Sequence, residues 1–329
     1  MGLALGTRLA ASGCEVLFVT RRPEQAECIA RQGVRLEDPA TGACLEAAAH
    51  ATADLADAAS RLVDRPIVFC TRTADLALTA GAISRLAPGA LAVAAQNGVD
   101  ADAVLSGCFA RVLGLVVRQT CTRFDDRSVR ATGAGRMVVG ACGQTEEHEA
   151  EAFSRRLARA DYDVGVSSDL GADRWLKLCT NLMSTPNALV VRQDHASRAF
   201  VETKARLLEE AQAVLAAAGI SARSCDGRDR SLEEEIAQQR ASLAAGSSAR
   251  DLPLYNQVWS SLRFGGPLEA DGYHRKIIEL GAAHGISTPQ NERVLQRLLR
   301  AQHDAHGPEC LRAAELLQGD FEGTLSGDP

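Results

Sequence analysis

The 329-residue sequence contains very little lysine. Only Lys177, Lys204 and Lys276 occur, so arginine supplies the other 33 of the 36 basic residues. The formal net charge is -6, and no basic stripe indicates a surface for nucleic acid. Because arginine serves wherever a surface charge is needed, a lysine inside an apolar helix is a candidate for chemistry.

Long apolar runs are missing as well. No stretch approaches the roughly 18 residues that suggest a membrane span. The first residues also lack the basic start and uninterrupted apolar segment of a signal peptide. We therefore expect a soluble, cytoplasmic protein. The ten cysteines are scattered singly, without a Cys-x-x-Cys pair, so neither a metal site nor a redox pair is predicted.

The first half of the chain alternates short apolar runs with amphipathic helical patterns, which predicts crossover units around a parallel sheet with helices on both faces. The predicted strands are residues 15–20, 67–71, 91–95 and 112–117, and the predicted helices are residues 22–32, 53–63 and 73–87. A later stretch, residues 129–140, is typical of two strands joined at a Gly-Ala-Gly turn.

After about residue 167 the pattern becomes helical, without a convincing strand. The helical segments are residues 170–185, 198–218, 230–246, 266–284 and 289–304, with a break at 246–248 and a new element starting at Pro253. We predict an α/β, Rossmann-type dinucleotide-binding domain at residues 1–167, followed by an all-helical domain at residues 168–329. By analogy, the helical domain is a candidate for substrate binding and homodimer formation.

The first residues, GLALGTRLAASGCEVLFVTRR, indicate the second half of a dinucleotide-binding turn. Gly2 stands where the third glycine of Gly-x-Gly-x-x-Gly opens a helix, and a strand follows at the expected distance. The same glycines are also compatible with tight helix packing alone. Arg21 and Arg22 end the strand where an NAD site has an acidic residue, so they favour NADP unless they are simply solvated. Arg72, after another strand, is a second candidate for the 2′-phosphate.

A polar strip runs along the segment DRWLKLCTNLMSTPNAL. One side of the predicted helix carries five polar residues, and its other side is apolar. The five are Lys177, Thr180, Asn181, Ser184 and Thr185. A partly desolvated ammonium can protonate a ketone oxygen, and an amide one turn away can hold a substrate group. The alternative is an ordinary exposed helix face.

Taken in order, these motifs resemble the ketopantoate reductase family, the 2-dehydropantoate 2-reductases. The resemblance covers nearly the whole chain. Besides the first 22 residues, it rests on Gln96-Asn97-Gly98, Gly114-Leu115-Val116, the segment 132–140 (TGAGRMVVG), Trp175-x-Lys177-x-x-x-Asn181, Glu269-Ala270-Asp271, Leu280-Gly281 and the segment 285–291 (GISTPQN).

The resemblance implies NADPH-dependent reduction of a 2-oxo acid to a 2-hydroxy acid, ketopantoate to pantoate or a related pair, as in pantothenate biosynthesis. It implies that Lys177 is the general acid and that Asn97 helps to position it near the nicotinamide. Asn181 is then a substrate ligand, and Glu269 helps to anchor the substrate hydroxyl and the lysine. Taken singly, Asn97 is also compatible with a turn residue and Glu269 with a solvated carboxylate.

The sequence departs from the family at several substrate-holding positions. Thr185 replaces a second asparagine before the proline of the lysine helix. Gln257 stands where a serine binds the substrate carboxylate, and Ser261 stands where an aspartate braces the site. His274-Arg275 replaces Asn-Gly after the Glu-x-Asp motif. Thr185 and Gln257 are retained as candidate substrate ligands, and the departures predict a substrate other than ketopantoate or a weak activity.

Family members begin with a strand and a complete glycine-rich turn, whereas Met1-Gly2 resembles only the end of that turn. We therefore expect about ten residues to precede Met1 in a working protein, and we expect weaker cofactor binding without them. Two alternatives stay open for the activity. One is another two-domain dehydrogenase of the opine or 3-hydroxy acid type, and the other is a non-catalytic dinucleotide-binding paralogue.

Overall fold

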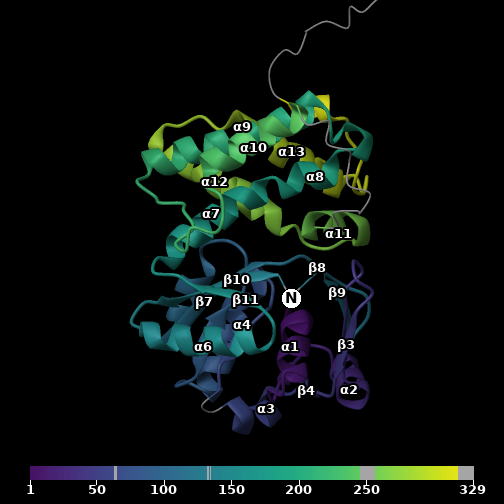
Figure 1. Ribbon diagram of the computed structural model, residues 1–329, viewed down its shortest axis with the longest axis vertical. Helices are drawn as coiled ribbons and strands as arrows, with labels where there is room; N and C mark the ends of the chain where they lie inside the picture. Colours follow the sequence, from purple (N-terminus) through teal and green to yellow (C-terminus); the bar gives the residue numbers. More distant parts are fainter. Residues whose placement is uncertain (63–64, 132, 134, 245–255, 318–329) are drawn as a thin grey trace, which may run out of the picture. The chain divides into compact units, whose positions relative to one another are not determined.

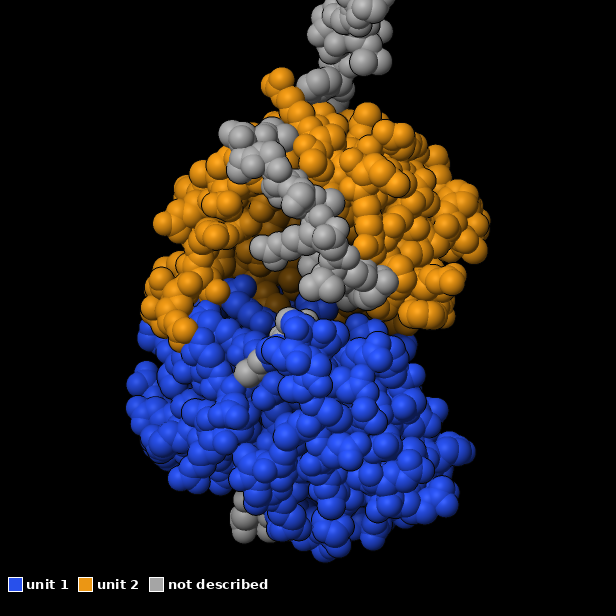
Figure 2. Space-filling model, turned by 45° about the vertical axis from the view of Figure 1, so that its right-hand side comes forward, with its two compact units in different colours: residues 1–174 blue, residues 175–329 orange. Residues whose placement is uncertain are grey.

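The computed structural model describes residues 1–62, 65–131, 133, 135–244 and 256–317 (Figure 1). The chain forms two compact units, residues 1–174 and 175–329, which Figure 2 colours separately. The predicted break at 246–248, the start at Pro253, and residues Thr132 and Ala134 lie outside the described residues. Within the described part of the chain, no helix combines the length and the apolar character that crossing a membrane requires.

The larger sheet of the first unit has five strands in the order β11-β10-β7-β6-β5. Strands β5, β6 and β7 are parallel, β10 runs antiparallel to β7, and β11 is parallel to β10. Their bounds are Ile67–Phe69 (β5), Leu91–Ala94 (β6), Arg111–Arg118 (β7), Arg136–Cys142 (β10) and Asp163–Val166 (β11). The strands predicted at 67–71, 91–95 and 112–117 are confirmed.

Helices cover both faces of this sheet. Helix α6 (Glu147–Arg159) packs over β10 and β11, as Figure 1 shows. Helices α4 (Thr73–Leu86) and α5 (Ala101–Ser106) belong to the core on the other face. In β6, Leu91 and Val93 contribute to the core under α6, whereas Ala92 and Ala94 contribute to the core under α4 and α5. Side chains of alternate residues point to opposite faces, and both faces are covered, so every residue of β6 is buried.

Two smaller sheets complete the first unit. One pairs β1 (Leu17–Val19) with β4 (His50–Thr52) in parallel. The other has the order β3-β2-β9-β8 and is contacted by α1 (Gly2–Ala11). Its strands are Val34–Glu37 (β2), Cys44–Ala47 (β3), Cys121–Arg123 (β8) and Ser128–Ala131 (β9). In sequence, helix α2 (Pro23–Gln32) lies between β1 and β2, and helix α3 (Leu55–Leu62) lies between β4 and β5.

These sheets add two findings to the sequence prediction. The two strands predicted within residues 129–140 are confirmed as β9 and β10, but they enter different sheets. Among the described residues, no ladder joins β1 to β5, so each of these strands is paired along one edge only. Strand β1 therefore stays separate from the larger sheet.

The second unit is helical. Its longest helix, α9 (Arg198–Ala217), is contacted by α10 (Leu232–Ala244), α12 (Glu269–His284) and α13 (Pro289–His303). The predicted segment 170–185 is divided into α7 (Leu170–Leu182), in which the boundary between the units falls, and α8 (Ser184–Leu189). Helix α11 (Gln257–Phe264) was not predicted, and two short 3-10 helices lie at Arg192–Asp194 and Ala313–Glu315. The fold class, an α/β Rossmann-type domain followed by an all-helical one, is confirmed.

Candidate functional site

The predicted cofactor residues lie at the carboxyl ends of strands in the first unit. Arg21 and Arg22 follow β1, Arg72 follows β5, and Asn97 follows β6. This is the edge at which open α/β sheets bind ligands, because helix N-termini and strand-end loops converge there. All four residues therefore follow the carboxyl ends of strands, Arg21 and Arg22 in the two-stranded sheet and Arg72 and Asn97 in the larger sheet.

Two of the three arginines already have carboxylate partners. The Nη1 atom of Arg21 lies 3.5 Å from Asp75 Oδ2 in the first turn of α4, and Arg22 forms an ion pair with Asp126. Arg72 precedes α4 and is exposed, and it forms no ion pair within the described part of the chain. Asp75 was not considered in the sequence prediction, because it is far from the strand end in sequence and reaches Arg21 only in the fold.

Helix α1 packs closely against two strands at its glycines. A Cβ atom on Gly2 would lie 3.2 Å from the Cβ of Cys70, directly after β5, and one on Gly6 would lie 2.3 Å from the Phe18 ring on β1. Both glycines therefore serve tight packing. No side chain caps the helix at Met1, and the first turn of an α-helix has backbone N–H groups without a partner inside the helix. Such a helix start, together with Arg21 and Arg72, fits a phosphate-bearing dinucleotide.

The loop that carries Asn97 is held on both sides. The Gln96 side-chain amide donates to the carbonyls of Phe69 and Thr71, at 2.9 and 3.0 Å, which ties the loop to the end of β5. Gly98 adopts a φ of 89°, a value that favours glycine. Asn97 itself is partly buried between these two anchored neighbours.

Arg174 also holds this loop, and the sequence prediction missed it. Its guanidinium is 3% exposed and donates to the carbonyls of Ala94 and Gln96, at 3.0 and 2.9 Å, and to both carboxylate oxygens of Asp102. The sequence offered only an arginine in a helix, because Asp102 lies 72 residues away. The structure shows a buried bidentate ion pair that fixes the end of β6.

The residues of the predicted polar strip are divided between two helices: Lys177, Thr180 and Asn181 lie on α7, whereas Ser184 and Thr185 lie on α8. Lys177 and Asn181 are partly buried, while the neighbouring Leu176, Leu178 and Leu182 are buried. The hydroxyl of Thr180 donates to the Lys177 carbonyl, and that of Ser184 donates to the Asn181 carbonyl. These hydroxyls are therefore turned back onto the helix, and the lysine ammonium and the Asn181 amide are the strongest polar groups of the strip.

The other predicted substrate ligands differ in their accessibility. Thr185 is 0% exposed, and its hydroxyl lies 3.0 Å from His274 Nε2. Gln257 is exposed, but its Nε2 donates to the Ser261 hydroxyl and to the Pro267 carbonyl, both at 2.9 Å. Glu269 is the partly exposed first residue of α12. Two pairs of residues that depart from the family pattern, Thr185 with His274 and Gln257 with Ser261, therefore contact each other.

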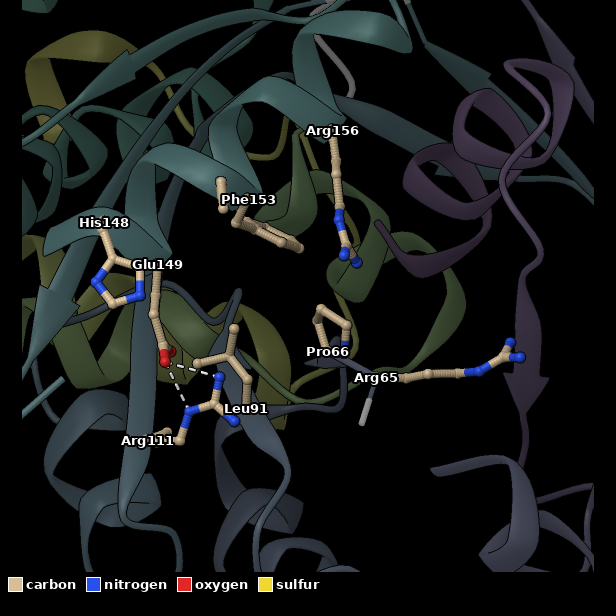
Figure 3. A pocket seen from close by; sticks show the side chains of 9 residues that line it. Arg65, Pro66, Leu91, Arg111, His148, Glu149, Phe153 and Arg156 are labelled. Carbon is tan, nitrogen blue, oxygen red and sulfur yellow. Dashed lines mark hydrogen bonds and ion pairs between the residues drawn. The ribbon is translucent and has the colours of Figure 1, made fainter. Parts of the chain in front are cut away.

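A separate pocket of about 200 Å³ lies at the opposite edge of the larger sheet (Figure 3). It is next to the first residues of β6 and β7, Leu91 and Arg111, and Arg111 pairs there with Glu149 at 2.7 Å. The pocket contains none of the predicted site residues. Because dinucleotides bind at the carboxyl ends of the strands, this pocket is not the cofactor site.

Comparison with known proteins identifies two family models that match the chain. The model described as "Ketopantoate reductase PanE/ApbA" matches residues 1–144, and its C-terminal counterpart matches residues 169–302. A 2-dehydropantoate 2-reductase of Halobacterium salinarum is 22% identical over 308 residues, which are 92% of this chain and 96% of that protein. A 2-dehydropantoate 2-reductase of Caulobacter vibrioides is 29% identical over 169 residues, 51% of this chain and about half (52%) of that protein.

Solved structures show the same fold. A ketopantoate reductase from Ralstonia eutropha superposes with a TM-score of 0.72 at 21% identity, covering 92% of this chain and 95% of that one. D-mandelate dehydrogenase, solved with NADH and anilino(oxo)acetate, superposes with a TM-score of 0.75 at 16% identity, covering 93% and 96%. At these identities the likeness is one of fold.

Proposed function

The chain belongs to the ketopantoate reductase family of oxidoreductases, and on this premise we propose that it reduces a 2-oxo acid to a 2-hydroxy acid, with NADPH as the hydride donor and ketopantoate or a related acid as the substrate. The observation that carries the proposal is the Lys177–Asn181 pair. One of only three lysines stands one helical turn from an amide, both partly buried, beside the buried side chains of Leu176, Leu178 and Leu182.

Lys177 is the proposed general acid. NADPH, when bound, supplies a hydride to the carbonyl carbon of the substrate. The Lys177 ammonium donates a hydrogen bond to the carbonyl oxygen, stabilises the negative charge that develops on it, and transfers its proton from Nζ to that oxygen. Its partial burial strengthens this electrostatic interaction, because less water competes for the developing charge.

Asn181 and Glu269 are the proposed substrate ligands. The Asn181 amide can donate to a substrate carboxylate or hydroxyl from the same face of α7 as the lysine. Glu269, partly exposed at the start of α12, would accept a hydrogen bond from the substrate hydroxyl and attract the Lys177 ammonium. Gln257 would offer its Oε1 atom, since both Nε2 protons are already used.

NADPH would be held by the first unit. The backbone N–H groups at the start of α1, beside Gly2, would suit the pyrophosphate. Arg72 is the best candidate for the 2′-phosphate, because Arg21 and Arg22 must first leave Asp75 and Asp126. Asn97, in its anchored loop, would lie toward the nicotinamide. Asp75 is also a possible hydrogen-bond acceptor for an unphosphorylated ribose, so NADH is the competing cofactor.

The test is a reductase assay with a panel of 2-oxo acids, including ketopantoate, with and without an amine. We expect oxidation of NADPH with at least one 2-oxo acid and no need for the amine. Lys177→Ala should lower kcat at least a hundredfold, while the NADPH Kd stays unchanged. Lys204→Ala is the matched control, because Lys204 is also partly buried but packs over the Phe200 ring on α9.

Each alternative gives a different result in the same assay. Activity that requires an amine would indicate an opine-type dehydrogenase. NADPH binding without turnover of any 2-oxo acid would indicate a non-catalytic paralogue. Full activity of Lys177→Ala would refute the assignment of the general acid.

A further inference from the structure

Four polar side chains of the second unit, three of them fully buried, form a continuous hydrogen-bonded chain. The hydroxyl of Thr185 on α8 lies 3.0 Å from Nε2 of His274 on α12. Nδ1 of the same histidine lies 2.9 Å from Oδ1 of Asn291 on α13, and Nδ2 of Asn291 lies 2.8 Å from Glu210 Oε2 on α9. Thr185, His274 and Asn291 are each 0% exposed. The hydrogen-bonded chain therefore joins four helices, and it is shielded from solvent except at Glu210, which is partly exposed.

Glu210 determines which group donates and which accepts in each hydrogen bond between these four side chains. Its carboxylate accepts the backbone N–H groups of Gln290 and Asn291, at 2.7 and 2.9 Å, at the start of α13. An acceptor at this point turns the Asn291 NH2 group toward Glu210 and leaves Asn291 Oδ1 facing His274. Since Oδ1 can only accept, the proton of a neutral His274 is on Nδ1, and Nε2 accepts the hydroxyl proton of Thr185. Burial lowers the pKa of His274 to about 4, so the ring is neutral near pH 7.

Both ends of the Thr185–His274 bond lie near proposed site residues in sequence. Thr185, near the start of α8, follows Asn181, near the end of α7, by four residues, and His274 follows Glu269 by five residues of α12, roughly 7.5 Å of helix. A shift of α12 along α8 would move Glu269 relative to Lys177 and Asn181. The bond lies close enough to both groups to limit such a shift.

We propose that His274 is a positioning residue, which holds Glu269 in register with the lysine strip by accepting the Thr185 hydroxyl and donating to Asn291. This inference rests on the proposed function. It also limits which side chains can bind the substrate, because the Thr185 hydroxyl is already hydrogen-bonded to His274. The strip that a substrate can contact therefore ends at Asn181, which removes Thr185 from the set of substrate ligands.

The pairing of the two departures supports the proposal. Thr185 and His274 are 89 residues apart, and both replace residues that the family pattern would have at these positions. A histidine without a donor to Nε2 would leave a buried acceptor unsatisfied, which is costly. The two replacements therefore satisfy each other, and neither is expected to function without the other.

The experiment compares Thr185→Val with Thr185→Ser. Valine has nearly the same shape but no hydroxyl, whereas serine keeps the hydroxyl. We expect Thr185→Val to lower kcat at least tenfold with the NADPH Kd unchanged. The KM for the 2-oxo acid should also rise at least tenfold, because Glu269 moves away from the substrate hydroxyl. Thr185→Ser should restore both quantities to within about threefold of the wild type.

The matched control is Thr203→Val on α9. Thr203 is also 0% exposed, and its hydroxyl donates to the Ala199 carbonyl of its own helix. A loss of melting temperature shared by Thr185→Val and Thr203→Val, with kcat and KM unchanged in both, would overturn the proposal. A wild-type protein that reduces no 2-oxo acid would refute the proposed function, and the positioning role with it. The ring ¹⁵N shifts of His274 would then still decide, independently, whether Nδ1 carries the proton.

Discussion

Gly114 and Gly140 lie directly opposite each other on the antiparallel strands β7 and β10. Their missing side chains leave a notch in the sheet that Leu170, the first residue of α7, fills. A Cβ atom on Gly114 would lie 2.1 Å from Leu170 Cδ2, and one on Gly140 would lie 2.8 Å from Leu170 Cβ. The notch lets α7 approach the sheet closely enough for Arg174, one turn further on, to reach Asp102 and the end of β6.

This relationship predicts that Gly114→Ala destabilises the first unit. The added methyl would also lie 2.8 Å from Asp102 Oδ1, so both the packing and the ion pair must shift, at a cost of about 1–3 kcal/mol. Gly81→Ala is the control, because Gly81 is inside α4 with nothing within 4 Å of the new methyl. It should be neutral or stabilising by up to about 1 kcal/mol. Urea unfolding measures both, and equal midpoints for the two variants would contradict the prediction.

Arg174→Met should be one of the most destabilising single changes in the first unit. It leaves the Asp102 carboxylate and two carbonyls without their buried donor, and breaking a buried pair costs about 3–5 kcal/mol. Arg155→Met removes an exposed ion pair with Glu151 and should cost less than about 0.5 kcal/mol. Because Arg174 also holds the Asn97 loop, the NADPH Kd should rise in the first variant and stay constant in the second. If the folded Arg174→Met protein binds NADPH with an unchanged Kd, the hydrogen bonds of Arg174 to the Asn97 loop do not contribute to cofactor binding.

Much of the fold follows from local patterns, which is why the sequence predicts it. The strands of the larger sheet are continuous apolar runs, and α9, α12 and α13 carry a clear helical period. Helix α11 was missed because it has only eight residues, although two signals bound it. Asn256 caps its start by accepting the Trp259 N–H, and Gly265 ends it in the left-handed conformation.

Other features depend on contacts that no local pattern contains. Strand β2 pairs with β9, so Arg35 and Ser128 are neighbours in the sheet although more than half of the sequence of the first unit separates them. His274 was interpreted only as a departure from a family pattern, because its partner Thr185 is 89 residues away. The spacing of Lys177 and Asn181 within one helix could be predicted from the sequence, whereas the contact between Thr185 and His274 could not. Spacing along a helix is fixed by 3.6 residues per turn, but contacts between helices are fixed by the packing of the whole core.

The lowered pKa of His274 leads to a prediction of how the free energy of unfolding depends on pH. Its folded-state pKa of about 4 is below its ordinary value of 6.5, so the unfolded chain binds the proton more readily. The stability contribution is complete above pH 6.5 and is lost as the pH falls toward 4, by on the order of 3 kcal/mol. His195, whose pKa is also lowered by burial, acts in the same direction. Glu210, whose pKa burial raises, acts in the opposite direction.

The contribution of His274 can be isolated by comparing the wild type with His274→Gln at pH 7 and pH 4.5. Glutamine keeps an acceptor near the position of Nε2 but does not titrate, so the wild type should lose more free energy of unfolding over this interval. Titration of the histidine rings by NMR gives a second measurement, in which the His274 ring should stay neutral at pH 5.5. Parallel loss of stability in the two proteins, with His274 protonated at that pH, would contradict the lowered pKa.

The choice between NADPH and NADH should depend on Arg72. Of the three arginines at the carboxyl edge, Arg72 has no carboxylate to leave before it binds a phosphate, whereas Arg21 must leave Asp75. Arg72→Ala should therefore raise the NADPH Kd at least tenfold, about 1.4 kcal/mol, and leave the NADH Kd unchanged. Arg85→Ala, at the other end of α4, is the control for a lost surface charge. Fluorescence titration with both nucleotides measures the effect. If Arg72→Ala weakens both nucleotides equally, Arg72 contacts the shared pyrophosphate instead, and Asp75→Ala becomes the variant that distinguishes the two cofactors.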